Sequence, residues 1–112
     1  MLTQKEFNKL VKEYLARIEK TLLDKGHDYT NVDPVENFKL LQNYPKGIPP
    51  TVAALFEISV KHNRLKNLVL SDKIPKNESV DDTILDLACY AILMHVIRAE
   101  EEKSPTKNLN TS

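Results

Sequence analysis

The sequence has few of the residues on which disulfide-bonded or hairpin-rich proteins depend. Its 112 residues include one cysteine, two glycines and no tryptophan. A single thiol excludes a disulfide framework within one chain, and Cys89, which stands among apolar residues, is expected to be buried. Two glycines leave little material for tight β-hairpins.

The sequence also lacks an excess of charge of one sign and a long apolar run. Sixteen basic and sixteen acidic residues cancel, so no overall field draws the chain to nucleic acid or to a membrane surface. The longest apolar run, LACYAILMHVI over residues 87–97, is too short to span a bilayer. The first residues, MLTQKEF, show no signal-peptide pattern. We therefore expect a cytoplasmic protein that binds neither membranes nor nucleic acid.

The composition is that of one globular domain. Hydrophobic residues make up 41% of the chain and charged residues 29%. A chain of 112 residues is long enough for one core and too short for two ordinary domains. We expect a single helical domain over residues 1–102 and a disordered tail over residues 103–112.

The apolar pattern predicts an all-α helical bundle of three long helices and a short one. The first, over about residues 3–25, begins with a capping box between Thr3 and Glu6 and is expected to end at Gly26. The short helix is expected over 33–41, and the other long helices over 51–70 and 78–102. The stripe of the first helix comprises Phe7, Leu10, Val11, Tyr14, Leu15, Ile18 and Leu22. The stripe of the helix over 51–70 is expected to comprise Val52, Leu55, Phe56, Ser59, His62, Leu65 and Val69, broadened by Ile58, Val60 and Leu68.

The last helix is apolar nearly all round between Ile84 and Ile97, which indicates burial on several sides. His95 lies in this run and is expected to be a core histidine, because no second histidine or cysteine stands at zinc-ligand spacing. Three long helices of one chain can hardly cover such a helix. We therefore expect a homodimer or a higher homo-oligomer, completed through the last two long helices.

The last two long helices carry charged residues of opposite sign. Three carboxylates follow one another at steps of four residues in the last helix: Glu78, Asp82 and Asp86. Because four residues advance a helix by about 400°, the three side chains share a face, and their like charges repel one another. The helix over 51–70 carries Lys61 and Arg64. The two faces are therefore complementary in charge.

Two interpretations of these faces remain open, and both can hold at once. The first is a set of interhelical salt bridges, in which Lys61 and Arg64 pair with Asp82 and Asp86. Such pairs add little to stability, because the cost of desolvating the charges offsets their attraction. The second is a Mg²⁺ site, since Mg²⁺ prefers a few carboxylate oxygens together with water and phosphates. Lys61 and Arg64 would then bind the phosphate oxygens.

The segment between the first two long helices carries further candidates. Asp28, Tyr29, Asn37 and Phe38 could stack on a nucleobase and hydrogen-bond to it, and they could equally serve as a helix cap, a core side chain and a short helical stripe. His27 has an ordinary explanation, since a histidine near a helix C-terminus interacts favourably with the helix dipole.

Three stretches together resemble a known family. They are KGHDYTNVDPVENF, KHNRLKNL and ESVDDTILDLACYAIL, and the resemblance covers about residues 15–97. The chain resembles the phage and bacterial nucleotide-modification-associated domain of the first type. Its pattern has an Asp-Tyr loop, an Asn-Phe pair, an Asp-Lys-x-x-Arg-Leu helix and a Glu-Ser-x-x-Asp-Thr-x-x-Asp-Leu-x-x-Tyr helix. Such domains are similar to the all-α nucleoside triphosphate pyrophosphatases of the MazG type, which use Mg²⁺.

The resemblance implies a MazG-like fold and a nucleotide pyrophosphohydrolase of phage or bacterial nucleotide metabolism. The implied catalytic residues are Glu78, Asp82, Asp86, Lys61 and Arg64. The implied metal ligands are Glu57, Glu78, Asp82 and Asp86. The implied substrate-binding residues are Asp28, Tyr29, Asn37, Phe38 and Tyr90. The substrate would be a nucleoside or deoxynucleoside triphosphate, including a modified one.

Two departures from the family pattern keep an alternative open. Val60 stands where the pattern has an aspartate, and Glu57 is alone where MazG-type enzymes carry paired glutamates. These departures favour a non-catalytic protein that binds, sequesters or senses a nucleotide, or that regulates a partner enzyme. A third interpretation is a purely structural helical oligomer, which would respond to no ligand.

Overall fold

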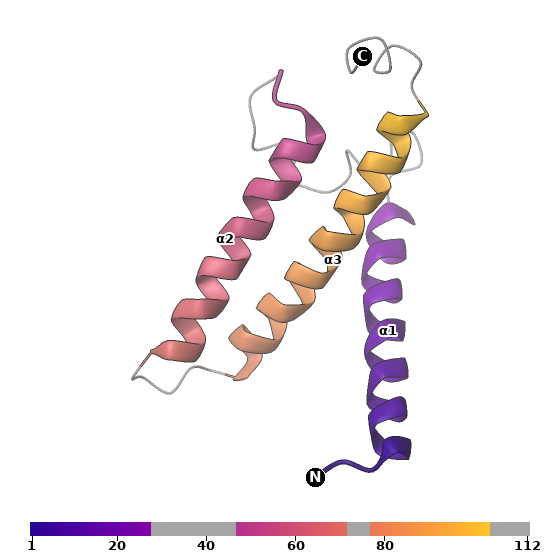
Figure 1. Cartoon of the computed structure of the whole chain (residues 1–112), viewed down its shortest axis with the longest axis vertical. Coiled ribbons are helices and arrows are strands. Elements are labelled where there is room, and N and C mark those ends of the chain that lie inside the picture. Colours follow the sequence, from indigo (N-terminus) through magenta and orange to yellow (C-terminus); the bar gives the residue numbers. More distant parts are fainter. Residues whose placement is uncertain (28–46, 72–76, 104–112) are drawn as a thin grey trace.

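Three α-helices make up the part of the chain that the structure describes. This computed structural model describes residues 1–27, 47–71 and 77–103, without the side chains of 25–27 and 77–79. The helices are α1 (Gln4–His27), α2 (Pro50–Leu70) and α3 (Asn77–Glu102), and α3 lies between the other two (Figure 1). No strand occurs in the described ranges, so the all-α prediction is confirmed there. The short helix predicted over 33–41 lies outside them.

The first turn of α1 is fixed by the predicted capping box. The Thr3 backbone N–H donates to Oε1 of Glu6 at 3.0 Å, and the Glu6 N–H donates to Oγ1 of Thr3 at 3.1 Å. These bonds satisfy two of the donors that a helix start leaves unpaired. The predicted end is wrong, because Gly26 is helical and α1 continues to His27. Glycine permits a helix to stop but does not force it to do so.

Proline chemistry defines the start of α2. Pro50 occupies the first turn, where its missing N–H costs nothing, and the Pro49 carbonyl accepts from Val52 at 2.9 Å and from Ala53 at 3.1 Å. Gly47, just before, has φ of +100°, a conformation that favours glycine. The predicted bounds of both later long helices agree with the structure to within a residue.

Helices α2 and α3 run antiparallel and form the core. The start of α2 meets the end of α3, where the Thr51 hydroxyl donates to Oε1 of Glu101 at 2.9 Å. The buried cluster consists of Ala53, Ala54, Leu93 and Ile97, with Leu22, Tyr90 and Met94 packed against it. Two alanines at the contact allow the helix axes to approach closely.

The stripe predicted for α2 is wrong in part. Leu55, Phe56 and Val69 from that stripe are exposed, whereas Leu65, together with Ile58 and Leu68 that broaden the stripe, lies on the side of α2 that faces α3. The buried or half-buried residues on that side are Ala54, Glu57, Ile58, Lys61, Leu65 and Leu68. Because α2 is apolar on two sides, spacing alone did not identify the packed one, and the small alanines decided it.

The last helix is only partly covered within one chain. Cys89 is buried, as predicted, but His95 is exposed, so its assignment to the core is wrong. Ile84, Ile92 and Val96 are also exposed, because α1 and α2 leave one side of α3 open. The predicted oligomer stays a prediction. In the described part of the chain no helix has the length and apolar character needed to cross a membrane.

Candidate functional site

A lysine of α2 and an aspartate of α3 meet between the two helices. Nζ of Lys61 lies 3.3 Å from Oδ2 of Asp86, and the two side chains are 21% and 41% exposed. The sorting of charge between the helices predicted this salt bridge. Since both partners keep contact with solvent, the pair is accessible to a ligand.

The ring of Tyr90 also lies close to the ammonium group of Lys61. Nζ of Lys61 is 5.9 Å from the centroid of the Tyr90 ring, within the range of a cation–π interaction. Tyr90 stands one turn after Asp86, so both side chains project from the same face of α3. We call Lys61, Asp86 and Tyr90 the Lys61 cluster. Sequence reasoning missed the contact between Lys61 and the ring, although the spacing of Asp86 and Tyr90 carried the signal.

The neighbouring charged residues are arranged around the Lys61 cluster. Glu57 precedes Lys61 by one turn and is half-buried, whereas Arg64 follows Lys61 by one turn and is exposed. Asp82 precedes Asp86 by one turn and is exposed. Among the described residues neither Arg64 nor Asp82 takes part in a salt bridge. The predicted set of salt bridges is therefore reduced to Lys61 with Asp86.

Several predicted site residues cannot be placed. The Glu78 side chain is not described, although its backbone belongs to the first turn of α3. Asp28, Tyr29, Asn37 and Phe38 lie outside the described residues. Their roles stay predictions.

The chemistry of the described carboxylates fits Mg²⁺ held jointly with a phosphate ligand. No three histidine, cysteine, aspartate or glutamate side chains in the described ranges come together as a metal site. Asp82 and Asp86 nevertheless offer hard oxygen ligands one helical turn apart, and both reach solvent. Mg²⁺ commonly binds through one or two carboxylates together with water and substrate phosphates. The two aspartates therefore suit a divalent cation whose remaining ligands are water and phosphate oxygens.

The arrangement places basic side chains on α2 and carboxylates on α3, and Lys61 meets Asp86 between the two helices. A phosphate chain approaching here meets Lys61 and Arg64 from α2 and two aspartates from α3. Lys61 can exchange its bond to Asp86 for a bond to a phosphate oxygen, which would free the aspartate for a metal. The site can thus bind a polyanion and a divalent cation together.

The chain matches no family, no curated protein and no solved structure in the comparisons with known proteins.

Proposed function

We propose that the chain is a Mg²⁺-dependent nucleotide pyrophosphohydrolase of phage or bacterial nucleotide metabolism. The substrate would be a nucleoside or deoxynucleoside triphosphate, including a modified one, and the setting the cytoplasm, where such nucleotides are used. The observation that supports the proposal is the pairing of Lys61 with Asp86 in a position open to solvent. An oligomeric, MazG-like assembly belongs to the same proposal.

The proposed reaction adds water across the bond between the α- and β-phosphates and yields a monophosphate and pyrophosphate. Lys61 and Arg64 would bind phosphate oxygens and neutralise the charge that develops during phosphoryl transfer. Asp82 and Asp86, helped by Glu57 and Glu78, would hold Mg²⁺. The metal would polarise the phosphates and activate the attacking water.

Recognition of the nucleoside would fall to other residues. Asp28, Tyr29, Asn37 and Phe38 carry the side chains suited to stacking and hydrogen bonding with a base. Tyr90, whose ring lies beside Lys61, would contact the substrate next to the phosphates.

Pyrophosphate release from a panel of canonical and modified nucleotides tests the proposal. Asp82→Asn removes a carboxylate that is exposed and in no described salt bridge, so the variant should fold and lose Mg²⁺-dependent release by at least tenfold. Asp24→Asn, an exposed aspartate on α1, is the matched control and should keep full activity. Equal release by the parent, Asp82→Asn and buffer would refute the enzymatic proposal.

A second candidate function is nucleotide binding without turnover. Val60 and the single Glu57 favour it, because Val60 stands where the family pattern has an aspartate and Glu57 is alone where MazG-type enzymes carry paired glutamates. Isothermal titration with nucleotides in the presence of a chelator distinguishes the two functions. Metal-independent binding without pyrophosphate release supports the binding protein, whereas binding that requires Mg²⁺ supports the enzyme.

A further inference from the structure

The salt bridge between Lys61 and Asp86 occupies the group that a phosphate would need. Nζ of Lys61 lies 3.3 Å from Oδ2 of Asp86, and this pair joins two helices. The other salt bridge in the described ranges, Lys9 with Glu13, joins residues one turn apart on α1. Carboxylate and phosphate oxygens both accept charge-assisted hydrogen bonds from an ammonium group. Asp86 is therefore an anion that the chain supplies to its own cation.

The geometry of the pair allows Asp86 to leave. Lys61 is 21% exposed and Asp86 is 41% exposed, so water reaches both charges and weakens the attraction between them. The Tyr90 ring, whose centroid lies 5.9 Å from Nζ, is a second partner of the ammonium group. Because the ring carries no charge, it can help to hold Lys61 in place without repelling an incoming anion. Lys61 thus keeps one partner when it loses the other.

The same pair also affects the metal. While Asp86 is held by Lys61, the positive charge of the ammonium group lies beside one of the two aspartates suited to Mg²⁺ and repels a divalent cation. When Lys61 turns to a phosphate oxygen, Asp86 becomes available together with Asp82, which is exposed one turn earlier. Release of Lys61 and release of Asp86 are therefore one event.

We propose that Asp86 competes with phosphate for Lys61, and that Lys61 competes with Mg²⁺ for Asp86, so that the two ligands bind cooperatively. Because this coupling rests on the proposed nucleotide site, it concerns how that site is regulated. Either ligand alone must break the salt bridge, whereas the second ligand finds its partner already released. The coupling is reciprocal, so phosphate strengthens metal binding by the same factor by which metal strengthens phosphate binding. The site thus favours a metal-bound polyphosphate over either component alone.

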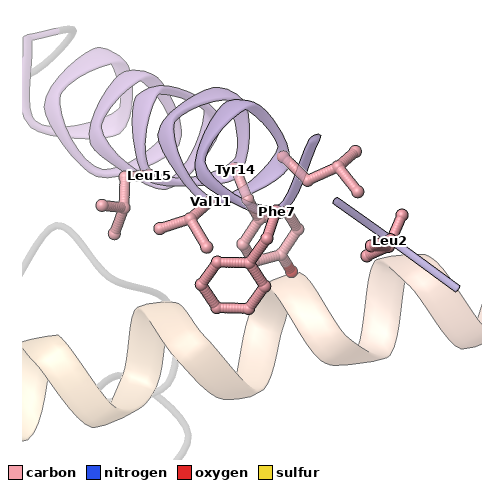
Figure 2. A pocket seen from close by; sticks show the side chains of 6 residues that line it. Leu2, Phe7, Val11, Tyr14 and Leu15 are labelled. Carbon is pink, nitrogen blue, oxygen red and sulfur yellow. The ribbon is translucent and has the colours of Figure 1, made fainter. Parts of the chain in front are cut away.

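The apolar groove of α1 offers no alternative place for a phosphate. It encloses about 500 Å³, and Figure 2 shows its side chains on the side of α1 that is turned toward α3. The lining residues are Leu2, Phe7, Leu10, Val11, Tyr14 and Leu15. None of them is charged, so an anion that entered the groove would lose hydration without gaining an opposite charge.

The first experiment measures anion binding without metal. Inorganic tripolyphosphate is titrated calorimetrically into the full chain in buffer freed of divalent cations. Asp86→Asn should bind it more tightly than the parent by about fivefold or more, because the competitor for Lys61 has lost its charge. Asp81→Asn removes the same charge from an exposed residue of α3 that is in no described salt bridge. This matched control should change the affinity by less than about twofold, because solvent and salt screen the charge.

A double-mutant cycle separates competition from a general effect of charge. Lys61→Met removes the cation and keeps most of the side chain, and in this background Asp86→Asn should bring no such gain. Equal gains with and without Lys61, or an equal gain from Asp81→Asn, would overturn the proposal. An Asp86→Asn protein that binds tripolyphosphate no more tightly than the parent would overturn it as well.

The second experiment measures metal binding without phosphate. Mn²⁺ takes the same oxygen ligands as Mg²⁺, and its binding is followed by its paramagnetic effect on water relaxation. Lys61→Met should bind Mn²⁺ more tightly than the parent by about fivefold or more, because Asp86 is no longer held. Lys66→Met, at an exposed lysine of α2 in no described salt bridge, should change the affinity by less than about twofold. Unchanged or weaker Mn²⁺ binding by Lys61→Met contradicts the competition.

Neither experiment measures turnover, so failure of this coupling and failure of the proposed hydrolysis are distinguishable. A chain that releases pyrophosphate but shows no gain in either titration keeps the proposed function and refutes the coupling. A chain that shows both gains but releases no pyrophosphate supports the coupling and refutes the enzyme.

Discussion

Lys61 is the residue on which the proposed site depends. Its ammonium group contacts the Asp86 carboxylate and lies near the Tyr90 ring, and a fifth of the side chain remains exposed. A fully buried pair would be costly to break, but a partly exposed one gains little from its attraction because water screens it. Stability alone therefore gives little reason for Lys61 and Asp86 to be placed together, whereas binding of a charged ligand does.

Asp86→Asn should accordingly have a small effect on stability. Because the carboxylate is 41% exposed, we expect the free energy of unfolding to fall by less than about 1 kcal/mol in urea denaturation. Glu13→Gln, which removes the exposed pair of Lys9 and Glu13 on α1, is the control and should cost less than about 0.5 kcal/mol. A loss of about 3–5 kcal/mol for Asp86→Asn would mean that the pair is a buried structural element.

The capping box predicts an acid-sensitive start of α1. Hydrogen bonds from the Thr3 backbone, and then from its side chain, lower the pKa of Glu6 below its ordinary value of 4.5. The ionised form is thus favoured in the folded state, and its stabilising effect is present above pH 4.5 and lost as the pH falls through the lower folded pKa. Glu6→Ala should be less stable than the parent at pH 7, and the difference should shrink in acid. A difference independent of pH would contradict the role of the charge.

At the scale of the helices, the contact of α2 with α3 depends on small side chains. Ala54 is fully buried, so Ala54→Leu inserts a larger side chain where no space is left. Overpacking of this kind costs about 1–3 kcal/mol. Ala16→Leu, at an exposed position of α1, should change the unfolding free energy by less than about 0.5 kcal/mol. Similar thermal melts for both variants would show that α2 and α3 are not closely packed.

Helix starts were easier to predict than helix faces. The starts of α1 and α2 depend on residues adjacent in sequence, Thr3 with Glu6 and Pro49 with Pro50. The packed face of α2 depends instead on which partner can approach, so Phe56 was expected inside and lies outside. In the candidate site, charge sorting predicted that Lys61 meets Asp86. The distribution of charge could not predict that Asp82 and Arg64 form no salt bridge, because the distance between two side chains on different helices depends on how the helices cross.

At the scale of the whole molecule, each of the three helices in the described part of the chain exposes large hydrophobic side chains. Such surfaces mark interaction sites when they are contiguous, as in the groove of α1. The Lys61 cluster lies on the contact of α2 with α3, whereas the groove is lined by Leu2 and by residues of α1, so variants of the two surfaces change different residues. The functional unit we propose is a dimer with a nucleotide site in each chain.

The most direct test of the central claim, that the surface around Lys61 and Asp86 binds a nucleotide with Mg²⁺, is a thermal melt of the parent and of Asp82→Asn. Each protein is melted alone, with Mg²⁺, and with Mg²⁺ and the nucleotide selected by the panel. At a ligand concentration about 100 times Kd, the parent should melt roughly 10–15 °C higher. Asp82→Asn should melt at or above the temperature of the ligand-free parent and gain no such shift. A parent that no nucleotide stabilises, together with a strongly destabilised Asp82→Asn, would show instead that the charged residues serve only the fold.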